Sequence, residues 1–327
     1  MIRVVLLGLP FWSRRLAAIL NRRPLELEAE FLPLGALASP AGLRKVLAAD
    51  VLLRLGYRPG APTWRGRGFD ALWSVLRTLN PRAQGVHYWQ GTDVLNSLED
   101  ARAGRLRPGP MARARRELHW TVAPWLDDEL AEVGLKSRFI ALPVVLEGVQ
   151  PPASLPAPFT VLSYIPDNRW DFYDGPTFYR AALALPDLRF EVIGGAGALV
   201  ERPLPNLTFF GWQADVRPFL ERATVAVRLV RHDGVAQSVR EALLAGRHVI
   251  YSQNLPMVTV VPYQDPERLV AALRDLHRRF EAGELQPNLA GQRYVNETFG
   301  LDTSLASYLE DLHRLVSGPT ALEAPQP

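Results

Sequence analysis

The chain has 327 residues, enough for two domains of ordinary size, and 48% of them are hydrophobic, which is typical of packed globular protein. It contains no cysteine, which excludes structural disulfides and thiolate metal sites and favours a reducing, cytoplasmic compartment. Its 37 basic and 34 acidic residues give a net charge of +3. The sequence lacks the dense basic block that is typical of nucleic-acid-binding proteins, so no nucleic-acid partner is expected, whereas a weak contact with an anionic membrane surface is compatible with this charge.

The N-terminal half alternates short apolar runs with helical stretches. Residues 4–7 predict a buried strand that ends at Gly8, and residues 12–21 have helical spacing. The first apolar run is too short for a secretory signal, and no run reaches the ~20 residues that a membrane-spanning helix needs. Further strands are expected at residues 50–55, 85–88, 120–122 and 138–141, and a helix at 126–133.

A proline-rich connector, EGVQPPASLPAPF, follows at residues 147–159 and predicts a domain boundary. The alternation then restarts. Strands are expected at residues 159–164, 190–193, 207–210, 225–230 and 248–252, and helices at 176–185, 216–222, 235–245, 266–281 and 301–316.

Two blocks of alternating strands and helices predict an α/β protein with two Rossmann-like, doubly wound, mostly parallel sheets. We expect an N-terminal domain at residues 1–150 and a C-terminal domain at 151–305. A helix and tail at 306–327 are expected to pack back on the N-terminal domain. Because ligands of such sheets bind beyond the carboxyl ends of the strands, the expected site is a cleft in which the two domains face each other.

The stretch RLVRHDGVAQSVREALLAGRHVIYSQ, residues 228–253, contains the strongest site candidate. Its helix has an apolar face, and a helix N-terminus can hold a phosphate. Gly234 lets a ligand approach the backbone closely. Glu241, two turns in, can accept hydrogen bonds from vicinal hydroxyls of a ribose. By themselves, Asp233 and Glu241 are equally consistent with a helix cap and a solvated side chain.

The segment HDGVAQSVREALLAGRHVIYS resembles the C-terminal signature of retaining GT-B glycosyltransferases of family 4, in which two acids stand at this spacing. The resemblance implies that Glu241 binds the donor ribose and that Asp233 is a catalytic residue beside the donor sugar. It also implies that the amides of Ala236 and Gln237 meet the diphosphate. The first acid is Asp here, one methylene shorter than the Glu of the family.

Two further segments resemble the same family. In VLSYIPDNRW, Arg169 stands at the position of a cation that neutralises the donor diphosphate, whereas Tyr164 replaces a second, arginine cation. FEVIGGAG resembles the family's next strand and glycine turn. LTFFGWQADV resembles the segment that passes the nucleobase, which places Trp212 near the base.

The match is thinner in the N-terminal half. Gly8 falls where the family has a glycine-containing loop near the donor phosphate. HYWQGTDVL resembles the segment that brings a His and an Asp toward the sugars, so that His87 is expected as a catalytic contact of the donor sugar and Asp93 as a contact of an acceptor hydroxyl. A His between aromatic residues is also a common structural residue.

The function expected from this resemblance is transfer of a sugar from a nucleotide-diphosphate-sugar to an acceptor hydroxyl with retention of configuration. No metal or other cofactor is expected, because the sequence has neither a suitable loop carboxylate pair nor a His/Cys cluster. A saccharide, lipid-linked or small-molecule acceptor, including one of polysaccharide biosynthesis, remains open. The alternatives are another GT-B reaction such as epimerisation, and a non-catalytic nucleotide-sugar-binding partner of another transferase.

Overall fold

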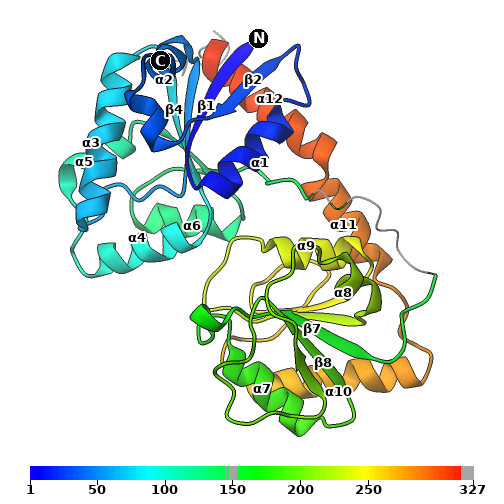
Figure 1. Ribbon diagram of the computed structural model, residues 1–327. Coiled ribbons are helices and arrows are strands. Elements are labelled where there is room, and N and C mark those ends of the chain that lie inside the picture. The colour runs from blue at the N-terminus through cyan, green and yellow to red at the C-terminus, as the bar shows by residue number, and fades with distance from the viewer. Residues whose placement is uncertain (145, 147–152, 318–327) are drawn as a thin grey trace, which may run out of the picture. The chain divides into compact units, whose positions relative to one another are not determined.

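The computed structural model describes residues 1–144, 146 and 153–317. The chain forms two compact units (Figure 1). Unit 1 comprises residues 1–143 together with the last helix, and unit 2 comprises Val144–Gly300. Residues 147–152 of the expected proline-rich connector lie outside the described residues.

Unit 1 is built on a parallel six-stranded sheet with strand order β2-β1-β3-β4-β5-β6. Its strands are β1 (Ile2–Gly8), β2 (Leu27–Phe31), β3 (Val51–Leu55), β4 (Gln84–Trp89), β5 (Leu118–Thr121) and β6 (Arg138–Phe139). Its helices are α1 (Pro10–Leu20), η1 (Leu34–Ala38), α2 (Pro40–Ala48), α3 (Trp64–Leu79), α4 (Thr92–Arg102), α5 (Pro108–Ala114), α6 (Trp125–Glu132) and α12 (Leu301–Ser317).

Helices α2 and α3 cover the same face of the unit 1 sheet. Val46 of α2 and Trp73 of α3 lie in one apolar cluster with Leu52 of β3. Both helices begin at side-chain caps: the hydroxyls of Ser39 and Thr63 each accept a backbone N–H three residues on. Local capping therefore sets where the helices begin, and apolar burial fixes them on the sheet.

Helix α12 belongs to unit 1 although it follows unit 2 in the sequence. The Tyr308 hydroxyl lies 2.8 Å from that of Tyr88 in β4, and Asp311 forms an ion pair with Arg138 in β6. The Tyr308 ring also packs 5.9 Å from Trp120 in β5. These contacts attach the end of the chain to strands that precede it by 173 to 220 residues.

Unit 2 is a second parallel six-stranded sheet, with strand order β12-β11-β10-β7-β8-β9. Its strands are β7 (Thr160–Tyr164), β8 (Arg189–Ile193), β9 (Leu207–Phe209), β10 (Val225–Arg228), β11 (His248–Tyr251) and β12 (Thr259–Val260). Its helices are η2 (Asp167–Arg169), α7 (Gly175–Ala184), α8 (Arg217–Arg222), α9 (Gln237–Leu244), α10 (Pro266–Glu281) and α11 (Leu289–Phe299).

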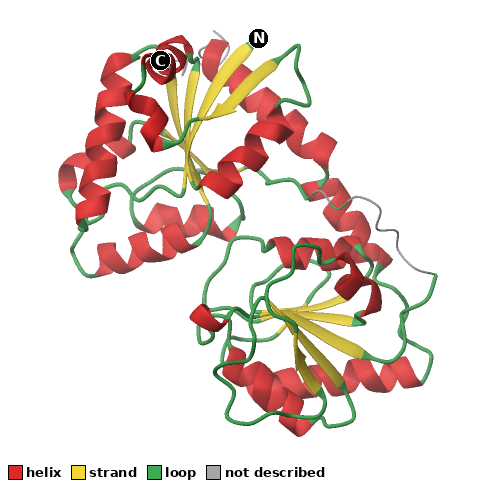
Figure 2. Ribbon diagram, in the orientation of Figure 1, coloured by secondary structure: helices red, strands yellow, loops and turns green. Residues whose placement is uncertain are grey.

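The two parallel, helix-flanked sheets expected from the sequence are confirmed (Figure 2). The helix expected at residues 235–245 starts two residues later, because the chain through Gly234 and Ala236 is bonded to the Tyr251 hydroxyl instead of following a helical path. Among the described residues, no helix is both long enough and apolar enough to span a membrane.

Candidate functional site

The carboxyl end of the unit 2 sheet brings together most of the site residues expected in the C-terminal half. Strand β10 lies between β7 and β11, and the register pairs Arg228 at its end with Tyr251. The loop that leaves β7 carries Arg169, and the loop that leaves β10 carries Asp233 and Gly234. Strand order therefore brings together loop residues as distant in the chain as Arg169 and Gly234, which are 65 positions apart.

An ion pair between Arg228 and Asp233 lies at the centre of this edge. Nε and Nη2 of Arg228 donate to Oδ2 of Asp233 at 3.1 and 2.8 Å. The two side chains are only 10% and 19% exposed. Burial acts to lower the pKa of Arg228, but the Asp233 carboxylate, followed by the phenols of Tyr173 and Tyr251, raises it above its ordinary value. Arg228 therefore stays charged, and Asp233 is its counterion.

Two guanidinium groups lie against the same aromatic ring. The Cζ atom of Arg228 lies 4.3 Å from the centroid of Tyr173, and that of Arg169 lies 5.5 Å from it and 3.9 Å from the centroid of Phe172. Tyr164 packs edge-on against Tyr173 at 5.7 Å. A phenol therefore stands where the family pattern has an arginine, and Arg228 of the neighbouring strand β10 contacts the same Tyr173 ring.

The N-terminus of α9 is held by one buried hydroxyl. Tyr251 Oη donates to the carbonyl of Gly234 at 2.7 Å and accepts from the amide of Ala236 at 3.4 Å. One residue on, the Gln237 side chain donates to the carboxylate of Glu241. Glu241 is buried, so it is not the fully solvated helix residue that spacing alone would allow.

The glycine turn after β8 is closed by a carboxylate. Asp167 accepts hydrogen bonds from the amides of Ala196, Gly197 and Ala198 at 2.8 to 3.3 Å. The same turn pairs with the loop after β9, where Gly194 donates to the carbonyl of Gly211 at 2.7 Å. The next residue, Trp212, is 74% exposed, which leaves its ring accessible for stacking.

In unit 1, Gly8 lies at the carboxyl end of β1, as expected. Its φ is +91°, and a Cβ atom there would lie 2.1 Å from the carbonyl oxygen of Leu55. Glycine is thus required by the close approach of β1 and β3. Its expected contact with the donor stays a prediction.

His87 lies on β4 and is fully buried. Its Nε2 lies 2.6 Å from a carboxylate oxygen of Glu117, and its ring stacks between Tyr57 at 4.1 Å and His119 at 5.0 Å. Burial lowers the pKa of His87 to about 3, so the imidazole is neutral and donates to the carboxylate. These contacts are those of a structural residue, and the catalytic contact expected for His87 stays a prediction.

Asp93 caps the start of α4. Its carboxylate accepts the amides of Gln90, Gly91 and Val94 at 2.8 to 3.1 Å. Burial raises its pKa to about 6, against the lowering effect of these hydrogen bonds. An acceptor hydroxyl that contacts Asp93 would have to share its carboxylate oxygens with these three amides. The expected contact of Asp93 with the acceptor also stays a prediction.

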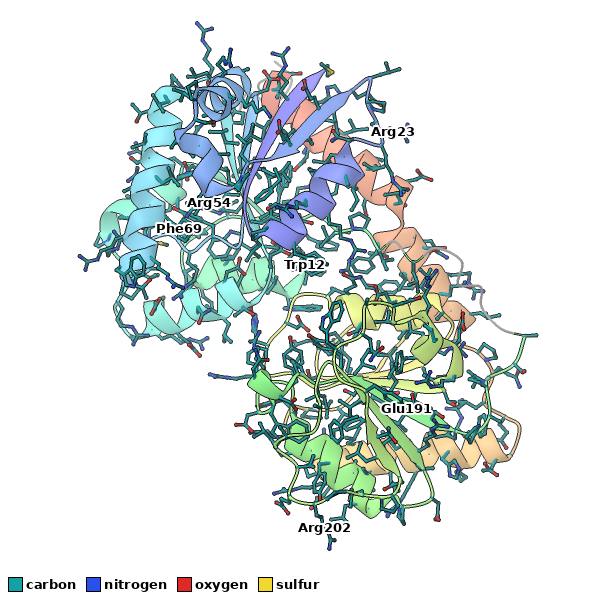
Figure 3. The ribbon with its side chains drawn as sticks, in the orientation of Figure 1. Trp12, Arg23, Arg54, Phe69, Glu191 and Arg202 are labelled. Atoms are coloured by element: carbon teal, nitrogen blue, oxygen red, sulfur yellow. The ribbon has the colours of Figure 1, made fainter. Side chains whose placement is uncertain are left out.

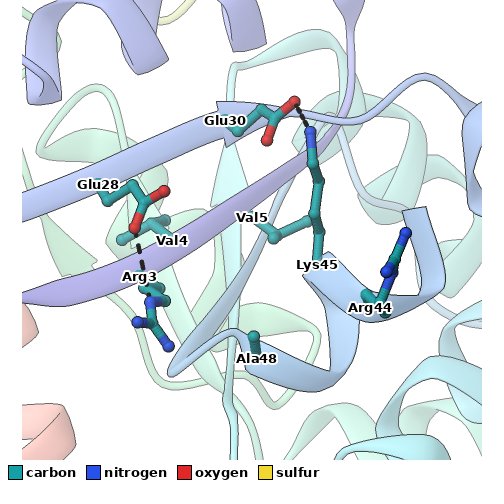
Figure 4. Close-up of a pocket in the computed structure, with 8 residues that line it drawn as sticks. All are labelled: Arg3, Val4, Val5, Glu28, Glu30, Arg44, Lys45 and Ala48. Atoms are coloured by element: carbon teal, nitrogen blue, oxygen red, sulfur yellow. Dashed lines mark hydrogen bonds and ion pairs between the residues drawn. The ribbon is translucent and has the colours of Figure 1, made fainter. Parts of the chain in front are cut away.

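A surface pocket of about 410 Å³ is lined by residues of β1, β2 and α2 in unit 1 and by none of the residues described above (Figure 4). Arg3 lies 3.5 Å from Glu28, and Lys45 pairs with Glu30. These acids neutralise two of the cations in the lining, so the pocket is not the expected anion site. The part of the chain that the structure describes contains no group of three or more His, Cys, Asp or Glu residues placed to hold a metal ion.

No protein-family model and no curated protein matches this sequence. Solved structures do match its fold over almost the whole chain. Sucrose-phosphate synthase from Thermosynechococcus elongatus matches with a TM-score of 0.71 at 14% identity, over 97% of this chain and 100% of the other. The fold is GT-B. A glycosyltransferase from Rickettsia africae matches with a TM-score of 0.71 at 12% identity, over 97% and 99% of the two chains. HepE from Anabaena, in complex with UDP-glucose, matches with a TM-score of 0.62 at 15% identity, over 95% and 99%.

Within this GT-B chain, sequence reasoning missed Tyr173, Tyr251 and Asp167. Tyr251 reads as core in the apolar run of residues 248–252, and only the strand register shows that its hydroxyl reaches Gly234. Asp167 carried a weak signal, since an Asp beside a proline often initiates a turn.

Proposed function

We propose that this protein is a glycosyltransferase that moves a sugar from a nucleotide-diphosphate-sugar to an acceptor hydroxyl. The observation that carries the proposal is the cluster at the carboxyl end of the unit 2 sheet. There, Arg169 and Arg228 flank one phenol ring, and the buried Glu241 lies on the helix whose N-terminus adjoins them. HepE, which shares the fold, is described in complex with UDP-glucose, and this supports the same donor class.

Each residue has a role that its environment supports. Arg169 and the amides at Ala236 and Gln237 bind the diphosphate, because a guanidinium and the N-terminus of a helix both favour a doubly charged anion. Glu241 accepts hydrogen bonds from the ribose hydroxyls. Trp212 lies beside the nucleobase, where its exposed ring can stack.

The proposed transfer retains the anomeric configuration and needs no metal ion. Charge on the departing diphosphate is stabilised by Arg169 and the α9 N-terminus, which together replace a bridging cation. Asp233 lies beside the sugar, and its negative charge stabilises the cationic character that the sugar gains in the transition state. No enzymic nucleophile takes part.

Two observations favour the second candidate, a non-catalytic nucleotide-sugar-binding partner. Asp233 is already the counterion of Arg228, and Tyr164 replaces a cation of the family pattern. A site with less positive charge would hold the ground-state donor but stabilise the leaving diphosphate less well. The other alternative, a different GT-B reaction such as epimerisation, can be distinguished from sugar transfer by its product.

Donor binding tests the proposal. Titration calorimetry of the purified protein with UDP-, GDP-, ADP- and TDP-glucose should identify a preferred base, with the same affinity in EDTA and in magnesium. The Glu241→Gln variant should lose ~1–3 kcal/mol of donor binding. The matched control is Glu267→Gln, on the exposed side of α10. No binding of any donor, or equal effects of the two variants, would overturn the assignment.

Turnover separates the candidates. Release of the nucleoside diphosphate in the presence of acceptor sugars, followed by NMR of the product anomer, should show transfer with retention. Tight donor binding without transfer or hydrolysis would support the binding partner, and an altered sugar released without transfer would support epimerisation. An inverted anomer would overturn the proposed stereochemistry.

A further inference from the structure

We infer that the outer surface of helices α2 and α3 in unit 1 docks on an anionic lipid membrane. The surface, called here the α2–α3 face, contains five apolar side chains, Leu43, Leu47, Trp64, Val75 and Leu79. They are 37% to 78% exposed. Large apolar side chains that are exposed singly are ordinary, but a continuous set on one face indicates a partner.

Apart from Phe69 (Figure 3), the exposed apolar residues of α3 form one stripe. Trp64, Gly68, Ala71, Val75 and Leu79 follow one another at intervals of four, three, four and four residues, which places them on one side of a helix. All five are exposed. The other side of α3, with Trp73 and Leu76, is buried on the sheet. The helix is therefore apolar on two sides, and only one of them is covered by this chain.

Helix α2 continues the stripe. The side-chain amide of Asn80, at the end of α3, donates to the carbonyl of Leu47 at 3.3 Å, so Leu47 and Leu79 lie at neighbouring helix ends. Leu43 lies one turn before Leu47 on α2. Figure 1 shows the two helices on the same side of the unit 1 sheet. The exposed apolar surface thus extends from one helix to the other.

The exposed charged side chains of α2 and α3 are all basic, although Lys45 is paired with Glu30 of β2. Arg44 and Lys45 lie beside the leucines of α2, and Arg65 and Arg67 flank the stripe at the start of α3. The guanidinium of Arg65 lies 5.3 Å from the ring of Trp64. The acid within the two helices is Asp70, which is buried and paired with Arg107. No exposed carboxylate of α2 or α3 would therefore repel an anionic surface.

Helix α10 of unit 2 shows what an ordinary solvated helix of this chain looks like. It has 16 residues, as α3 does. Its exposed side carries both signs of charge, with Glu267, Arg268, Arg274 and Asp275 among the exposed residues, and none of the large exposed apolar side chains belongs to it. The contrast indicates that the apolar stripe of α3 is a feature of that helix and not of the chain as a whole.

This combination of side chains favours a lipid surface. An apolar stripe with basic flanks lies in the interface of an anionic membrane, and tryptophan and arginine both suit the headgroup region. A second copy of the chain fits poorly, because a twofold contact would bring the basic flanks of the two copies together. The inference is independent of the proposed sugar transfer.

Sedimentation with vesicles tests the inference. Wild-type protein should bind vesicles of phosphatidylcholine with phosphatidylglycerol, more weakly as salt rises, and bind phosphatidylcholine alone poorly. Arg65→Glu with Arg67→Glu should lower the partition onto anionic vesicles at least about 25-fold, since each cation near such a surface contributes about fivefold (about 1 kcal/mol). Trp64→Ser with Val75→Ser should weaken binding to the same vesicles at all salt concentrations.

Matched controls lie in unit 2. Arg274→Glu on α10 and Leu183→Ser on α7 change exposed residues of the same kinds. They should leave vesicle binding unchanged, and all variants should keep the donor affinity of the wild type. Wild-type protein that fails to bind anionic vesicles, or control variants that lose binding equally, would overturn the inference. The inference would also be overturned if light scattering showed that the wild-type protein is a dimer and that the Trp64→Ser, Val75→Ser variant is a monomer.

Discussion

Replacing Asp233 by Asn should affect stability as well as turnover. Breaking a buried ion pair by removing one partner costs roughly 3–5 kcal/mol, because the remaining charge is left buried. Here the loss should be about 3 kcal/mol, the lower end of that range, since Asn keeps an acceptor for Arg228 and the Asp233 side chain is 19% exposed. Replacement of a helix-capping Asp by Asn would instead leave stability unchanged, because both residues cap well.

The assay pairs urea unfolding with donor turnover. A double variant, Asp233→Asn with Arg228→Met, removes both charges and keeps an unbranched side chain against Tyr173. It should recover stability to within about 1 kcal/mol of the wild type, since an apolar replacement of a buried pair is often neutral. Turnover should not recover, because the carboxylate beside the sugar is still absent.

Two results would refute this reasoning. If Asp233→Asn unfolds at the same urea concentration as the wild type, the Arg228–Asp233 pair does not exist in solution. If the double variant regains turnover together with stability, Asp233 serves only as the counterion of Arg228 and has no role at the sugar.

Three further outcomes are expected. Arg169→Ala should weaken nucleoside diphosphate binding in calorimetry by roughly 1.5–3 kcal/mol and spare the free nucleoside, and equal losses would contradict its assignment to phosphate. Tyr251→Phe should lower donor affinity and cost ~1–2 kcal/mol of stability, because the Gly234 carbonyl loses its hydrogen bond. If calorimetry shows unchanged donor affinity, the hydroxyl does not position α9. The pKa of His87 is about 3 in the folded protein, below its ordinary value, so the side chain takes up a proton on unfolding when the pH lies between the two values. The folded state therefore has its full stability above the ordinary pKa of His87 and loses stability as the pH falls below it. Denaturation should therefore show roughly 1.5 kcal/mol less stability at pH 5 than at pH 6.5, and a His87→Gln variant with the same pH slope would rule this out.

The parts of the site that sequence alone could predict are those within one loop and one helix. Asp233, Gly234 and Glu241 lie on a single short stretch, so their spacing fixes which end of α9 each occupies. The strands were predictable as well, since buried strands of a parallel sheet are continuous apolar runs. Gly8 was recognisable for the same reason, as the residue at which the first such run ends.

What the sequence could not supply is the identity of neighbours across the sheet. Arg228 and Asp233 are five residues apart, but Tyr173 and Tyr251 reach the pair only because β10 lies between β7 and β11. His87 shows the reverse case: its aromatic setting was visible, whereas its complete burial depends on Tyr57, Glu117 and His119.

The sequence by itself therefore determined two doubly wound sheets, the helix that carries Glu241, and the place of Arg169 after the first strand of unit 2. Only the tertiary structure decided that Asp233 is the counterion of Arg228 and that Tyr251 holds the start of α9. The physical reason is range. Helix spacing and apolar runs follow from neighbours a few residues apart, whereas strand order and register arise from hydrogen bonds and burial between segments distant in the chain.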